Sequence, residues 1–211
     1  MPDPAVDFAS LLCSRLCHDL LSPVGAMVNG IELLADEDDP EMRARVIELL
    51  ADSARASADK LKFFRLAFGA AGGLGEELAA EEVRAVLAGL VASNPRVELV
   101  WLVEQAAIPR ATAKILLNLG MIALDALVRG GRLIAAVEDG EVAIRAEGGR
   151  IVLDAGICAV LAGGAADMNS RTSAAWLVRR LADSGGRRVQ LAEEDGVLLL
   201  AAAPIAIAAS A

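Results

Sequence analysis

The chain has 211 residues and a formal net charge of −9, with 55% hydrophobic residues, 3% aromatic residues and no tyrosine. This length can bury a substantial core, and the shortage of aromatic residues favours an interior of Ala, Leu and Val between packed helices. The acidic balance argues against a nucleic-acid partner, because phosphate binding requires clustered Lys and Arg. We therefore expect a protein that meets other proteins.

No targeting or membrane segment is recognisable in the sequence. The N-terminus lacks a basic region followed by a long apolar stretch. No apolar run reaches the roughly 18 residues that a membrane-spanning helix requires. The three cysteines, an odd number, favour reduced thiols. Together these observations predict a cytoplasmic protein with no membrane partner.

Two long amphipathic segments open the chain. Between residues 5 and 36, apolar side chains recur every three or four positions, at Leu12, Leu16, Leu20, Val24, Met27, Ile31 and Leu34. A second helical pattern runs from residue 41 to residue 68, after an acidic turn that ends at Pro40. Two long helices joined by a short turn form an antiparallel hairpin. A lone hairpin cannot bury such wide stripes, so we expect two copies to form a four-helix bundle in a homodimer.

The pattern changes at the glycine-rich stretch 69–75, where we place a domain boundary. We expect the hairpin over residues 1–70 and a second domain over residues 76–211. In the second domain the patterns predict helices at 81–93, 109–129 and 172–183, and strands at 97–103, 133–137, 142–146, 151–153, 188–191 and 197–203. This order favours an α+β fold in which a layer of helices covers a mostly antiparallel sheet.

The only histidine of the chain, His18, lies in the first helical segment. On a helix it shares a face with residues at offsets of −4, −3, +4 and +7, which are Ser14, Arg15, Ser22 and Gly25. The apolar side chains that recur every three or four positions lie on another face of this helix, so we expect His18 to point away from the bundle core. A neutral imidazole is a good nucleophile near neutral pH and forms covalent phosphoryl intermediates. The neighbouring Asp19 is placed to orient the ring and to manage its proton.

A proline follows one turn later in the same helix. Because Pro23 has no backbone N–H, the helical hydrogen bond to the carbonyl of Asp19 cannot form. We expect this loss to kink or loosen the helix one turn beyond His18.

The stretch HDLLSPVGAM resembles the phosphoacceptor box of sensor histidine kinases, in which a His is followed by an acidic residue and then by a polar residue and Pro. The longer stretch LCHDLLSPVGAMVNGIELL is similar to the ChpT-type histidine phosphotransferases of alphaproteobacterial phosphorelays, and the similarity covers the whole chain. It implies a dimer whose helical hairpins form a four-helix bundle, each followed by an α/β sandwich that resembles a histidine-kinase ATPase domain. It also implies that His18 accepts a phosphoryl group from the receiver domain of a hybrid histidine kinase and passes it to response-regulator aspartates, with Asp19 as its acidic companion.

The same resemblance implies that receiver domains dock around His18. We expect the partner-binding residues to be Ser14, Arg15, Leu21, Ser22 and Gly25. No cofactor or metal is expected on this chain, and Mg²⁺ is expected on the partner receiver domain. In kinases the position of Ser22 is tied to dephosphorylation.

The second domain departs from a kinase where a kinase would bind nucleotide. The stretch from Asn118 to Ala123 resembles a kinase N-box, but Ile122 replaces the second Asn, and a branched aliphatic side chain cannot ligate Mg²⁺. The stretch that begins at Asp154 resembles a DxGxG motif without its second glycine. We therefore expect no ATP binding. Two alternatives stay open, a soluble histidine kinase that uses ATP and a scaffold that binds response regulators without phosphotransfer.

Two cysteines precede the histidine. Cys13 and Cys17 give the stretch CSRLCH, but a haem would lack a second His and a zinc ion would lack a fourth ligand. We expect both to be small thiols that face the core.

Overall fold

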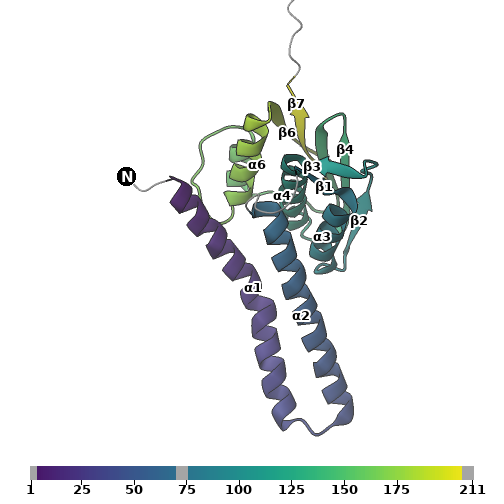
Figure 1. Cartoon of the computed structure of the whole chain (residues 1–211). Coiled ribbons are helices and arrows are strands. Elements are labelled where there is room, and N and C mark those ends of the chain that lie inside the picture. The colour runs from purple at the N-terminus through teal and green to yellow at the C-terminus, as the bar shows by residue number, and fades with distance from the viewer. Residues whose placement is uncertain (1–3, 70–75, 206–211) are drawn as a thin grey trace, which may run out of the picture.

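The computed structural model describes residues 4–69 and 76–205. Figure 1 shows two long helices that project from a part in which helices pack on a sheet, and this arrangement confirms the expected α+β class. The boundary proposed within residues 69–75 falls almost wholly outside the described residues, so the division into domains stays a prediction. No helix in the described ranges has the length and apolar character that crossing a membrane demands.

The first two helices form the expected antiparallel hairpin. They are α1 (Pro4–Asp36) and α2 (Pro40–Phe68). Proline suits the first position of α2, where its missing N–H would have no helical partner. The side chain of Asp39 caps the same helix by accepting a hydrogen bond from the backbone N–H of Glu41 at 3.0 Å.

The hairpin buries only one side of α1. Pro23 and Gly30 are buried toward α2, and a Cβ on Gly30 would lie 2.8 Å from Cδ2 of Leu50, so this leucine packs directly on the glycine. Large apolar side chains remain exposed on the opposite side, and we call them the apolar stripe of α1: Leu21, Val24, Val28 and Ile31. A single chain therefore buries only part of the apolar surface expected from the sequence.

The main sheet has five strands in the order β2-β4-β5-β7-β6. Their bounds are β2 (Val97–Trp101), β4 (Gly131–Glu138), β5 (Glu141–Glu147), β6 (Arg187–Glu194) and β7 (Val197–Pro204). Only the pairing of β2 with β4 is parallel. Both hairpins close through an Asp-Gly pair with positive φ, at Asp139-Gly140 and at Asp195-Gly196, which is the chemistry that tight hairpin turns favour.

Four helices join this sheet to form the core. They are α3 (Ala80–Ala92), α4 (Arg110–Ala126), α5 (Ala155–Leu161) and α6 (Ser173–Ser184). The central helix α4 is buried over most of its length against β4, β5 and β7. Ile144 of β5 pairs with Ala135 on one side and Leu200 on the other, and all three side chains are fully buried. The last turns of α2 add Phe63 and Leu66 to the same core.

Four short segments differ from the sequence predictions. The strands β1 (Glu77–Ala79) and β3 (Ala107–Pro109) pair with each other and are too short to show an alternating pattern. The strand predicted at 151–153 is wrong, because the backbone N–H of Val152 bonds the carbonyl of Ala126 at the end of α4 instead of a neighbouring strand. The helix α5 follows at once and was not predicted.

Candidate functional site

His18 stands on α1 with 87% of its side chain exposed to solvent. Its Nδ1 lies 3.4 Å from Oδ1 of Asp19, at the outer limit of hydrogen-bonding distance. A bond between these two atoms requires the proton to be on Nδ1, because a carboxylate only accepts. In that tautomer Nε2 carries the free lone pair, so the ring presents its nucleophilic nitrogen to the surroundings.

The backbone beside His18 is fixed from the second helix. Nζ of Lys60 on α2 donates to the carbonyl oxygen of Asp19 at 2.8 Å. This carbonyl is the one that Pro23, inside α1, leaves without a helical donor. Figure 1 shows that α1 changes direction along its length and that its N-terminal half diverges from α2 toward α6. The lysine thus supplies the missing hydrogen bond where the helix is loosened.

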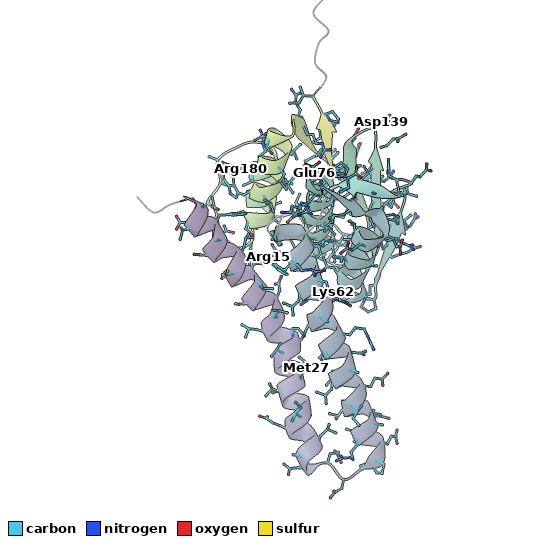
Figure 2. All side chains as sticks on the ribbon, in the orientation of Figure 1. Arg15, Met27, Lys62, Glu76, Asp139 and Arg180 are labelled. Atoms are coloured by element: carbon cyan, nitrogen blue, oxygen red, sulfur yellow. The ribbon has the colours of Figure 1, made fainter. Side chains whose placement is uncertain are left out.

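Arg15 does not face outward as expected. Only 13% of its side chain is exposed, and Nη2 lies 3.0 Å from Oδ2 of Asp125 on α4. Nη1 lies 3.5 Å from the carbonyl oxygens of Ser170 and Arg171, in the segment before α6. Figure 2 shows Arg15 where α1 passes the α/β part of the molecule. The guanidinium of Arg15 therefore contacts α4 and the segment before α6, and is not part of an open docking surface.

A cleft of about 440 Å³ separates His18 from the second part of the chain. Arg15, His18 and Asp19 line it from α1, and Asp125 lines it from α4. Desolvation by the cleft walls raises the pKa of Asp125, and the neighbouring Arg15 acts in the opposite direction. The guanidinium of Arg15, whose Nη2 lies 3.0 Å from Oδ2, stabilises the charged form of this carboxyl group.

The kinase-like residues of the second part have structural partners of their own. The amide nitrogen of Asn118 donates to the carbonyls of Ala67 at 3.2 Å and Lys114 at 2.8 Å, and so ties α4 to the end of α2. Oδ1 of Asp154 caps α5 by accepting from two backbone N–H groups. Ile122 is 2% exposed in the core and offers no ligand atom to a cation. Within residues 4–69 and 76–205, no group of three or more His, Cys, Asp or Glu side chains is arranged to hold a metal ion.

The other predicted contact residues lie along α1 near His18. Ser14, Leu21 and Ser22 are exposed, and Leu21 is 69% exposed. Gly25 is half-buried, and a Cβ placed there would meet no atom within 4 Å. The surface beside the histidine is therefore exposed to solvent, and no atom of this chain fills the space next to Gly25.

Cysteine placement and two long-range contacts differ from the sequence predictions. Cys13 and Cys17 are exposed, so the prediction of core-facing thiols is wrong for both. Sequence reasoning also missed Lys60 and Asp125. The proline signalled that the Asp19 carbonyl needs a donor, but only the packing of α1 on α2 and α4 selects which side chains reach the site.

Residues 80–197, more than half of the chain, match the family model for the histidine phosphotransferase C-terminal domain. This chain belongs to the histidine phosphotransferase family. The protein phosphotransferase ChpT of Brucella abortus (strain 2308) is 39% identical over 138 residues, which cover 64% of this chain and 62% of the Brucella protein. The matched region thus spans less than two thirds of that relative. A solved structure described as a bacterial phosphotransferase aligns with 96% of this chain and 98% of its own length, at a TM-score of 0.83 and 27% identity.

Proposed function

We propose that this chain is a phosphorelay carrier that accepts a phosphoryl group on His18 from the receiver domain of a hybrid histidine kinase and passes it to aspartates of response regulators. One observation carries the proposal. His18 is 87% exposed on a helix, and its Nδ1 faces the Asp19 carboxylate at 3.4 Å. This geometry leaves Nε2 free and accessible to a globular donor.

The transfer needs little chemistry from this chain beyond positioning. The Nε2 lone pair attacks the phosphorus of a phosphoaspartate in line with the acyl oxygen. The N–P bond forms, the P–O bond breaks, and the donor aspartate leaves as a carboxylate with the electron pair. The proton stays on Nδ1, where Asp19 stabilises the ring charge that develops. The reverse sequence delivers the group to the next aspartate, and Mg²⁺ held by the receiver domain would neutralise the phosphoryl oxygens.

The exposed apolar stripe of α1 supports a homodimer as the working form. Its four residues, Leu21, Val24, Val28 and Ile31, are spaced by three and four positions and lie along one side of the helix. Exposed apolar side chains also occur on α2, at Met42 and Leu49. Two hairpins that pack these surfaces together would form a four-helix bundle, with a His18 on each α1.

Transfer of radiolabelled phosphate tests the proposal. Receiver domains of hybrid kinases, labelled on their aspartates, are mixed with the wild-type chain and with His18→Gln. We expect acid-labile, alkali-stable label on the wild type, as for a phosphohistidine, and none on His18→Gln. The Arg45→Gln variant, which breaks only an exposed ion pair with Glu41 in α2, should label like the wild type. Label that persists on folded, dimeric His18→Gln would overturn the assignment.

A further inference from the structure

We propose that Arg15 is a positioning residue for His18, held in place by Asp125 of α4 and acting through the Asp19 carboxylate. The inference rests on the proposed function and adds to it a way in which the chain positions the phosphoryl acceptor. The second part of the chain, through Asp125, would set the geometry of the phosphoryl acceptor. No nucleotide is needed for such a role.

The contacts form a continuous series across the cleft. Oδ2 of Asp125 lies 3.0 Å from Nη2 of Arg15, and Nε of the same guanidinium lies 3.7 Å from Oδ2 of Asp19. The other oxygen of Asp19 lies 3.4 Å from Nδ1 of His18. Each carboxylate oxygen of Asp19 therefore faces a different partner. The guanidinium attracts one oxygen of Asp19 by charge, and so favours the orientation in which the other oxygen faces His18.

Burial makes Arg15 suited to this task. Its side chain is 13% exposed, against 67% for Arg45 in an ion pair of the same spacing on α2. A buried pair is screened less by water and salt than an exposed one, so the Arg15 contacts hold their geometry more strongly. Nε of Arg15 is buried and makes no hydrogen bond, which leaves it facing Asp19 by charge attraction alone.

Further charged groups face the cleft around Asp19. Lys60 of α2 binds the Asp19 backbone carbonyl, and Arg171 and Asp154 line the same cleft from the second part of the chain. Without Arg15, Asp19 would lose the only side-chain cation within salt-bridge distance among the described residues. Its carboxylate would then turn toward water, and the proton of His18 would no longer be held on Nδ1.

The single histidine gives a direct readout that does not depend on any partner. In protein labelled with ¹⁵N-histidine, the ring nitrogen signals at slightly alkaline pH report which nitrogen carries the proton. We expect the Nδ1–H form to dominate in the wild type. Its population should fall in Arg15→Gln and Asp125→Asn toward the level of Asp19→Ala. Arg15→Lys should recover part of it, and Arg45→Gln should leave it unchanged.

Phosphotransfer supplies the second readout. With the receiver domain that labels the wild type fastest, Arg15→Gln and Asp125→Asn should slow the transfer rate at saturating donor by about tenfold, because the acceptor is misoriented. The half-saturating donor concentration should change less. Asp125 is 62% exposed, so Asp125→Asn remains informative even if Arg15→Gln fails to fold. Wild-type tautomer and rate in folded Asp125→Asn would overturn the inference, whereas label on His18→Gln would overturn the proposed function and leave the tautomer result intact.

Discussion

Lys60 reaches from α2 to the backbone carbonyl of Asp19 at 2.8 Å, and this is the carbonyl that Pro23 deprives of its helical donor. The proline and the lysine therefore form a matched pair on opposite helices. An ammonium group satisfies a carbonyl that the helix itself cannot satisfy. The free energy of the hairpin depends on this bond, because an unpaired, partly buried carbonyl is costly.

Replacing Lys60 should destabilise the chain measurably. We expect Lys60→Met to lower the free energy of unfolding by about 1–2 kcal/mol, since a charge-assisted hydrogen bond is lost. Urea denaturation followed by circular dichroism measures the change. Lys62→Met is the matched control, because Lys62 pairs with Asp59 on the surface and its side chain is 60% exposed.

A double-mutant cycle separates this bond from other effects of the lysine. Pro23→Ala restores a backbone N–H to α1, which can bond the Asp19 carbonyl in the ordinary helical way. In that background Lys60→Met should cost less than it does in the wild type. Equal costs in both backgrounds would show that Lys60 stabilises the hairpin by some other contact.

The second part of the chain should not use ATP. Ile122 is buried where a kinase would place a cation ligand. The amide nitrogen of Asn118 is held by the carbonyls of Ala67 and Lys114, and its Oδ1, the atom that could ligate a cation, is buried in the core. Titration calorimetry with Mg²⁺ and ATP should show no binding heat, and labelled ATP should leave His18 unlabelled. Autophosphorylation of His18 would instead identify a kinase, and His18→Gln is the control for that result.

The three cysteines should differ in reactivity. Burial raises the pKa of the Cys158 thiol, and the carboxylates of Glu193 and Asp154 raise it further. Cys13 and Cys17 are exposed. At mildly alkaline pH, iodoacetamide should therefore modify these two before Cys158, because the thiolate is the nucleophile. Mass spectrometry of peptides follows the order, and raising the pH should accelerate the modification of Cys158.

The apolar stripe of α1 should control assembly. We expect Val28→Asp to shift the chain from dimer to monomer in sedimentation, because a charge would be buried at the centre of the bundle. Leu102→Asp is the matched control, since Leu102 is 56% exposed on the loop after β2, away from the hairpin. A dimer that survives Val28→Asp would place the interface elsewhere.

The elements with strong periodicity were predictable from the sequence, and so was the residue at the centre of the site. Both hairpin helices, the two Asp-Gly turns and the exposure of His18 follow from local patterns. The short strands β1 and β3 leave no such pattern. The extended residues 151–153 alternate like a strand because Ile151 and Leu153 pack on the core, although no strand in the described part of the chain pairs with them.

The surroundings of His18 were predictable only in part. Its helix face follows from spacing, but the direction of Arg15 depends on where α4 places Asp125, a residue 110 positions away in sequence. A long side chain at the edge of a helix face can turn either way. Tertiary packing determines the direction of the Arg15 side chain, and no local sequence pattern predicts it.

The burial of Phe63 and Leu66 within the same core as α4 has a mechanical consequence. The helix α2 belongs at one end to the hairpin and at the other end to the α/β part, with no hinge between its two ends in the range Pro40–Phe68. A continuous helix of this length is rigid. Heat or denaturant should therefore unfold the two parts of the chain in one cooperative step. A displacement of the end of α2 that packs in the core would be transmitted to the turn that joins α1 and α2.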